Sequence, residues 1–139
     1  MLYASQQEMV DRFGEQELIE LTDRANTGAI DAAVIGKVLL DANAEIDSYL
    51  QGNFSLPLVT VPPRLIEIAA DLARYKLYGA RTTDQVRNRY TDSIKYLQQL
   101  VLGNVSLGLD AAGEVVKIAS VATVVSSNKV FGRNGDRGF

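Results

Sequence analysis

The chain has 139 residues, 47% hydrophobic and 22% charged, which suits one globular domain with a modest core and argues against wholesale disorder. Its formal net charge of −3 argues against a dedicated nucleic-acid binder, because such proteins usually present a basic face. The lack of cysteine and histidine excludes disulfides, thiol chemistry, the usual zinc sites and histidine general bases.

The N-terminal part of the chain predicts two short helices and a polar loop. Ser5 and Glu8 have the spacing of a capping box, so a helix is expected to begin after Ser5 and to end near Gly14. A second helical turn is expected over residues 15–21, followed by a polar loop over residues 22–28. No basic stretch precedes an apolar run, so no signal peptide is expected, and no apolar stretch is long enough to cross a bilayer.

The middle of the chain predicts a long helix followed by a proline-rich connector. Asp31 is the expected N-cap and Gly52 the expected end, and the apolar residues between them recur at steps of three and four: Ile35, Leu39, Ala42, Ile46 and Tyr49. Residues 54–63 contain three prolines, which exclude a helix there and favour an extended, partly buried connector. Pro63 suits the first turn of the next helix, where a missing N–H is tolerated.

Two further amphipathic helices are expected before residue 104. The first covers residues 64–78 and ends at Gly79, with one apolar face made of Leu65, Ile68, Ala69, Leu72 and Tyr75. The second is capped by Thr82 or Thr83 and ends at Gly103, with one apolar face made of Val86, Tyr90, Ile94, Leu97 and Val101. Three long amphipathic helices with short connections predict a mainly α fold, a small antiparallel helical bundle over residues 1–103.

The character of the sequence changes after this bundle. Residues 115–125 are rich in valine and isoleucine without helical periodicity, which predicts a strand or extended segment. A lone strand leaves backbone groups unpaired, so it needs a neighbour to pair with. Residues 104–139 are therefore predicted to form an extended, partly β C-terminal arm. The candidate assembly interface in this arm is Val115, Val116, Ile118, Val121, Val124, Val125, Phe131, Arg133, Arg137 and Phe139.

Residues 23–34 imitate the calcium loop of an EF-hand, with Asp23 first and Gly28 sixth. The imitation fails where oxygen ligands are needed most, because Ala25 stands third and Val34 stands twelfth, in place of a bidentate glutamate. A tight turn that leads into the Asp31 cap explains the same residues better. No metal site is expected.

Other candidate chemistry is equally weak. The carboxylate pairs at helical spacing, Glu8 with Asp11, Asp41 with Glu45 and Glu67 with Asp71, are expected on solvent faces, where nothing shifts their pKa toward catalytic work. Tyrosines alternate with basic residues around positions 75 and 90, but helical spacing places Tyr75 and Tyr90 on apolar faces, which favours packing within the bundle over nucleic-acid stacking. Neither an enzyme nor a cofactor is expected.

Several blocks, taken in order, resemble a family of small proteins of Mu-like phages and prophages. The blocks are residues 1–5 (MLYAS), 9–14 (MVDRFG), 44–50 (AEIDSYL), 56–58 (LPL), 61–65 (VPPRL), 68–78 (IAADLARYKLY) and 137–139 (RGF). They cover nearly the whole chain, and their order makes the resemblance specific for the family.

The resemblance implies a structural protein of the phage neck. Proteins of this family look like the head–tail connectors, or adaptors, of other long-tailed phages, which are helical bundles that bind the portal as a ring, commonly of twelve copies. It thus implies a head-completion protein in the neck of the virion, present in the host cytoplasm during assembly, that joins the DNA-filled head to the tail.

The implied partners are the portal protein, copies of the chain itself, and a tail-side neck protein such as a stopper or tail terminator. Genomic DNA would pass without sequence-specific binding, and no membrane is implied. A closed ring requires two different surfaces on each subunit, which the bundle of residues 1–103, as a helical connector domain, and the arm of residues 104–139 can supply.

Two other functions stay open at this point. One is a tail-completion or stopper protein at another level of the same neck. The other is a small prophage-encoded DNA-binding regulator, which would need a basic recognition helix. The most basic candidate helix, residues 87–95, also carries Asp92.

Overall fold

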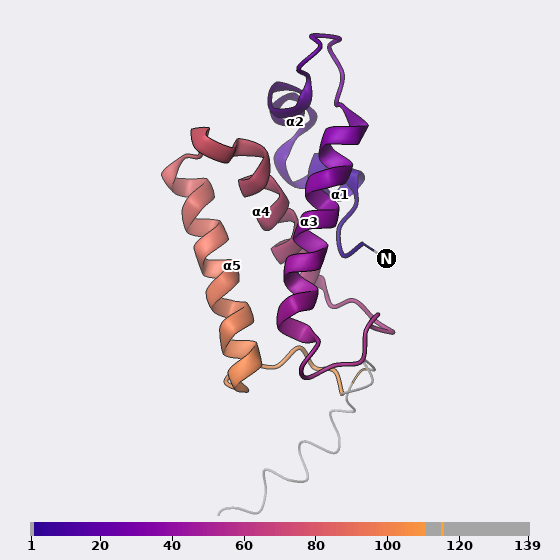
Figure 1. The fold of residues 1–139 in the computed structure, drawn as a ribbon, viewed down its shortest axis with the longest axis vertical. Helices are drawn as coiled ribbons and strands as arrows, with labels where there is room; N and C mark the ends of the chain where they lie inside the picture. The colour runs from indigo at the N-terminus through magenta and orange to yellow at the C-terminus, as the bar shows by residue number, and fades with distance from the viewer. Residues whose placement is uncertain (1, 111–114, 116–139) are drawn as a thin grey trace, which may run out of the picture.

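The computed structural model describes residues 2–110 and residue 115 (Figure 1). Over these residues the chain is mainly helical, as predicted, and contains no strand. The helices are α1 (Gln6–Phe13), α2 (Glu15–Thr22), α3 (Ala32–Leu50), α4 (Pro63–Tyr78) and α5 (Asp84–Leu102), with a short 3₁₀ helix η1 (Gly79–Arg81) between the last two. Apart from Val115, the strand expected over residues 115–125 lies outside the described residues.

The helices begin and end where short polar residues and glycine permit. The hydroxyl of Ser5 accepts a hydrogen bond from the Glu8 N–H at 3.2 Å, and the Asp31 carboxylate accepts two from the first turn of α3. Thr83, rather than Thr82, caps α5 through the Val86 N–H. Gly103 ends α5 in the left-handed conformation (φ 85°, ψ 6°), which a residue without Cβ adopts readily. The predicted N-caps are confirmed, and α3 ends at Leu50, two residues before the expected Gly52.

The helix α4 occupies the centre of the bundle. It runs antiparallel to α3 and to α5 and packs against both, while α1 and α2 cover the half of the bundle where α3 begins (Figure 1). Half of α4 is buried: Leu65, Ile68, Ala69, Ala70, Asp71, Leu72, Ala73 and Leu77. A helix covered from several sides needs apolar residues on more than one stripe, which explains why its alanines are buried alongside its leucines.

The predicted apolar faces are correct in part. Tyr49, Tyr75 and Tyr90 are only partly buried, and Val101 is 44% exposed, which contradicts its expected place in the core. The residues that α5 buries instead are Val86, Ser93, Leu97 and Leu100. Because α5 lies at the edge of the bundle, only a narrow face of this helix contacts the core. Val101 lies just outside that face, so its side chain is exposed to water.

The connector between α3 and α4 contains no helix and is partly buried, as predicted, but it bends at several residues and is not extended along its length. Leu58 is its anchor at 3% exposure, whereas Val61 is half-buried and Val59 is 70% exposed. The peptide bond before Pro57 is cis. After α5, residues 105–109 pack against the same core, and Leu109 forms an isolated antiparallel bridge with Val115.

Candidate assembly surface

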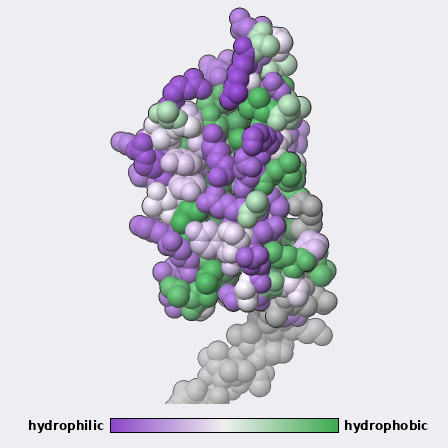
Figure 2. All heavy atoms as spheres, viewed as in Figure 1, coloured by the Kyte–Doolittle hydropathy of each residue, from purple (hydrophilic) through white to green (hydrophobic). Residues whose placement is uncertain are grey.

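Exposed hydrophobic side chains gather at one end of the bundle. This connector end consists of residues 49–63, where α3 ends and α4 begins, together with residues 98–110 and Val115. Val59, Leu102 and Val115 are 70%, 70% and 66% exposed there. Figure 2 shows hydrophobic surface at this end, next to the grey atoms. With Val101, four large apolar side chains are therefore exposed to solvent at the connector end.

Two hollows open on the connector end. One, of about 370 Å³, is lined mainly by the end of α5, with Tyr49, Gln98, Gln99, Val101 and Leu102. The other, of about 300 Å³, lies between residues 60–63 of the connector and residues 107–109, with Val115 at its wall. The Asn53 amide donates a hydrogen bond to the Val101 carbonyl at 3.4 Å, which ties the end of α3 to the end of α5. The surface is therefore hollowed as well as apolar.

Val115 is the one predicted interface residue that the structure describes, and it lies on the connector end. The others lie outside the described residues: Val116, Ile118, Val121, Val124, Val125, Phe131, Arg133, Arg137 and Phe139. Sequence reasoning missed Val59 and Leu102. A signal for Leu102 did exist, because an apolar pair directly before the helix-ending Gly103 has no later turn of the helix to cover it.

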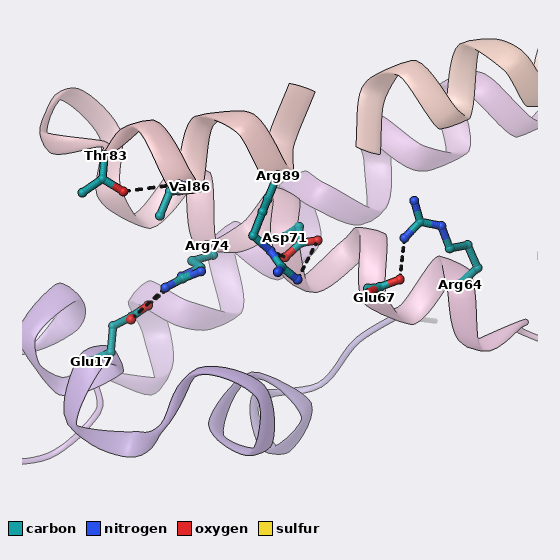
Figure 3. A network of polar contacts seen from close by, with 8 residues as sticks. All are labelled: Glu17, Arg64, Glu67, Asp71, Arg74, Thr83, Val86 and Arg89. Carbon is teal, nitrogen blue, oxygen red and sulfur yellow. Dashed lines mark hydrogen bonds and ion pairs between the residues drawn. The ribbon is translucent and has the colours of Figure 1, made fainter. Parts of the chain in front are cut away.

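A second group of residues forms ion pairs between helices (Figure 3). Arg74 on α4 donates two hydrogen bonds, of 2.7 and 2.9 Å, to the Glu17 carboxylate on α2. Arg89 on α5 donates two, of 3.0 and 3.4 Å, to Asp71 on α4. Burial works against the charged form of Arg74, yet the Glu17 carboxylate and the Tyr78 side chain together outweigh burial and raise the pKa of the guanidinium.

The expectation that Asp71 faces solvent is wrong. Asp71 is only 5% exposed, because α5 packs over the face of α4 that carries this residue. Glu67, the other half of that pair, is half-buried and bonds to Arg64 within α4. A buried carboxylate with two hydrogen bonds from one guanidinium serves as a structural clamp between α4 and α5.

Tyr75 and Tyr90 pack within the bundle, as predicted, and they lie against each other between α4 and α5. Their rings stack with centroids 4.0 Å apart. The Tyr90 hydroxyl donates a hydrogen bond to Glu45 on α3 at 3.1 Å, and Lys76 on α4 pairs with the same carboxylate at 2.9 Å. Glu45, expected on a solvent face, therefore joins three helices and is only partly exposed.

We predict that Tyr90 makes stability fall at high pH. Burial, and then the charge of Glu45, raises the pKa of Tyr90 to about 12 from the ordinary 10.0. Its contribution to the free energy of unfolding is fully present below pH 10 and is lost as pH rises toward 12, because only the unfolded chain releases the proton in that window. Urea unfolding at pH 9, 10 and 11 measures this decrease.

The Tyr90→Phe variant is the control for that experiment. It should lose less stability over the same pH range than the unaltered protein. Burial and a hydrogen bond to Asp47 raise the pKa of Tyr3 as well, so only the difference between the two proteins reports on Tyr90. An equal decrease in both proteins would contradict the prediction.

The loop that imitates a calcium site is a tight turn, as predicted. The Asp23 carboxylate accepts hydrogen bonds from the N–H groups of Thr27 and Gly28, at 2.8 and 2.6 Å, and these bonds lower its pKa. Asn26 and Gly28 have the positive φ values, 62° and 82°, that such a turn requires. The loop's own donors thus occupy the oxygens of Asp23. Among the described residues, no three Asp or Glu side chains come together to hold a metal ion.

No helix among residues 2–110 has the length and apolar character needed to cross a membrane.

The sequence matches known phage proteins along most of its length. A family model described as "Bacteriophage Mu, Gp36" matches residues 3–126. The "Mu-like prophage FluMu protein gp36" of Haemophilus influenzae is 37% identical over 139 residues, which cover 100% of this chain and 99% of that protein. "Gene product J" of Escherichia phage Mu is 32% identical over 112 residues, 80% of this chain and 79% of that protein. The match extends through the bundle and into the C-terminal arm, so the chain belongs to the Gp36 family of bacteriophage Mu.

Proposed function

We propose that this protein is a structural subunit of the phage neck, a head–tail adaptor. In this proposal about twelve copies form a ring that binds the portal and joins the DNA-filled head to the tail. The protein would act in the neck of the virion and be present in the host cytoplasm during assembly. It would not be an enzyme.

The observation that carries the proposal is the apolar connector end and its place in the chain. Val59, Leu102 and Val115 are exposed there, and the chain leaves the described structure at that same end. A closed ring needs one surface that donates and a different surface that receives. The valine-rich arm of one copy and the hollowed connector end of the next copy are such a pair. Burial of these side chains would supply about 1.5–3 kcal/mol for each large one.

The charges support passage of DNA rather than its recognition. The formal net charge is −3, and the arginines of α5 that could form a basic face are paired with acids. Arg87 bonds to Asp84 at 3.1 Å, and Arg89 bonds to the buried Asp71. A recognition helix needs free guanidinium groups on one face, so these pairs weigh against a DNA-binding regulator.

Co-expression with the portal protein of the same phage tests the proposal. The full chain should co-purify with the portal as a ring visible by electron microscopy. We expect Leu102→Asp, and truncation after Asp110, to reduce the recovered complex by about tenfold or more, because each removes one half of the paired surfaces. The truncation keeps residues 105–109, which pack against the core.

The matched control is Leu40→Asp. Leu40 is 62% exposed on α3 and lies outside the connector end, so the same substitution should leave the complex intact. Circular dichroism of each variant checks that the helices are retained. Normal ring formation by both Leu102→Asp and the truncated chain would contradict the proposal. Recovery of the full chain with the tail-tube subunit instead of the portal would favour a stopper or tail-completion protein.

A further inference from the structure

A third hollow lies away from the connector end, on the half of the bundle where α5 begins. It has a volume of about 370 Å³ and is lined by Arg12, Phe13, Arg74, Gln85 and Arg89. These residues come from the end of α1, the second half of α4 and the first two turns of α5. Three guanidinium groups from three different helices therefore meet around one opening.

Two of these guanidinium groups are held in place before any ligand arrives. Arg74 is 14% exposed, bonds twice to Glu17 and lies over the Phe13 ring at 4.4 Å. Arg89 bonds twice to Asp71 (Figure 3). Side chains that are already ordered lose little conformational entropy when they bind.

The same guanidinium groups keep donors in reserve. The bonds to Asp71 use Nε and Nη2 of Arg89, so its Nη1 has no hydrogen-bond acceptor among residues 2–110 and 115. Arg74 uses the same two nitrogens for Glu17 and also interacts with the side chain of Tyr78. Arg12 uses only Nε, in a 3.4 Å contact with Glu8, and the exposed Gln85 amide has no acceptor within the described part of the chain. Free N–H groups of this kind suit a ligand with two acceptor oxygens in one plane.

The charge balance of the hollow indicates which kind of anion it can bind. Each arginine has a carboxylate partner, Glu8, Glu17 or Asp71, so the walls of the hollow are close to neutral, and the whole chain is acidic. A polyanion such as DNA is drawn by long-range positive potential, which this site lacks. A single carboxylate needs only the local hydrogen-bond geometry.

We propose that this arginine pocket binds the carboxylate of an aspartate or glutamate side chain on a protein partner. The partner belongs to the assembly, so this inference rests on the proposed function. The pocket lies on the half of the bundle away from the connector end, and it therefore gives the subunit a second, chemically different contact surface. Polar recognition here complements apolar burial at the connector end and contributes to the choice of partner.

The intact, isotopically labelled chain allows a direct test by NMR. Sodium acetate is titrated while the Nε–H signals of the arginines and the side-chain amide of Gln85 are followed. Arg12, Arg74 and Gln85 should shift together and saturate in the millimolar range, as befits a small ligand with few atoms. Inorganic phosphate and a short DNA duplex are titrated in parallel.

Gln85→Glu is the informative variant, because it is nearly isosteric, exposed and places a negative charge in the pocket. It should weaken acetate binding about tenfold or more through repulsion. Gln51→Glu is the matched control: it makes the same change at an exposed position at the opposite end of the bundle, and its acetate affinity should stay unchanged. Arg12→Gln, which removes free donors without uncovering a buried carboxylate, should also weaken binding.

The outcomes separate this proposal from the proposed function. Absence of acetate shifts, tighter binding of phosphate or DNA than of acetate, or equal loss in Gln85→Glu and Gln51→Glu would overturn the carboxylate pocket. Acetate binding with normal portal rings from Gln85→Glu would overturn its role toward a partner. If the chain binds acetate but does not join the portal, the carboxylate pocket is supported. The proposed neck function alone is then contradicted.

Discussion

Leu72→Asp is expected to leave the protein largely unfolded at room temperature. Leu72 is fully buried on α4, the helix that contacts both α3 and α5. The substitution removes about 1.5–3 kcal/mol of stabilisation from apolar burial and places a carboxylate in the hydrophobic core. Together these terms reach the total stability of a small domain, about 5–15 kcal/mol. Loss of the helical circular dichroism signal and of a cooperative thermal transition would show it.

Leu40→Asp is the control that separates the effect of burial from the effect of the leucine-to-aspartate change itself. Leu40 lies on α3 at 62% exposure, so the same substitution should cost only about 0.5 kcal/mol, mainly through helix propensity. A Leu72→Asp protein that melts within a few degrees of the Leu40→Asp protein would show that α4 is not the centre of the core.

Arg89→Leu is expected to cost about 2–4 kcal/mol by leaving the Asp71 carboxylate buried without its partner. Asp71 is 5% exposed, and both of its hydrogen bonds from α5 come from Arg89. The lower part of the usual range applies because the Arg89 end of the pair is 44% exposed and admits water. Urea unfolding of the variant measures the loss.

Two further proteins make this prediction specific. Arg87→Leu removes an arginine from the same helix, but its partner Asp84 has a 95% exposed side chain, so stability should change by about 0.5 kcal/mol or less. The double variant Asp71→Leu with Arg89→Leu should recover most of the loss, because it leaves no buried charge. Equal losses for Arg87→Leu and Arg89→Leu, or a double variant no more stable than Arg89→Leu, would contradict the clamp.

The clamp and the arginine pocket share Arg89. The side chain ties α5 to α4 through Nε and Nη2 while its Nη1 remains for the pocket. Replacing Gln85 or Arg12 changes the pocket while leaving Asp71 paired with Arg89. The stability and binding roles of the same helix face can then be measured separately.

Local sequence was enough to predict the helices and their ends. The capping residues Ser5, Asp31 and Thr83 act within four residues of themselves, and the proline connector excludes a helix by its own covalent geometry. The family resemblance also depended only on the order of short blocks. It is confirmed by the match over residues 3–126 and by the relatives from Haemophilus influenzae and phage Mu.

Burial of charges and exposure of apolar groups depended on how the helices meet. Helical periodicity marks which residues share a face, but it does not show how many faces a neighbour covers. Asp71 was expected in solvent because its own helix has a plainly apolar stripe elsewhere, and only the packing of α5 over α4 buries it. Val101 was expected in the core for the converse reason, since α5 lies at an edge.

The sequence by itself therefore determined the family, the mainly helical class and the positions where helices start and stop, since caps, prolines and periodicity act over a few residues. Only the tertiary structure decided that Val59, Leu102 and Val115 share one apolar end, and that Arg12, Arg74 and Arg89 share one pocket. The physical reason is distance along the chain. Successive members of these two groups lie between 13 and 62 residues apart in sequence. They come together only when helices pack to bury the leucines and isoleucines between them.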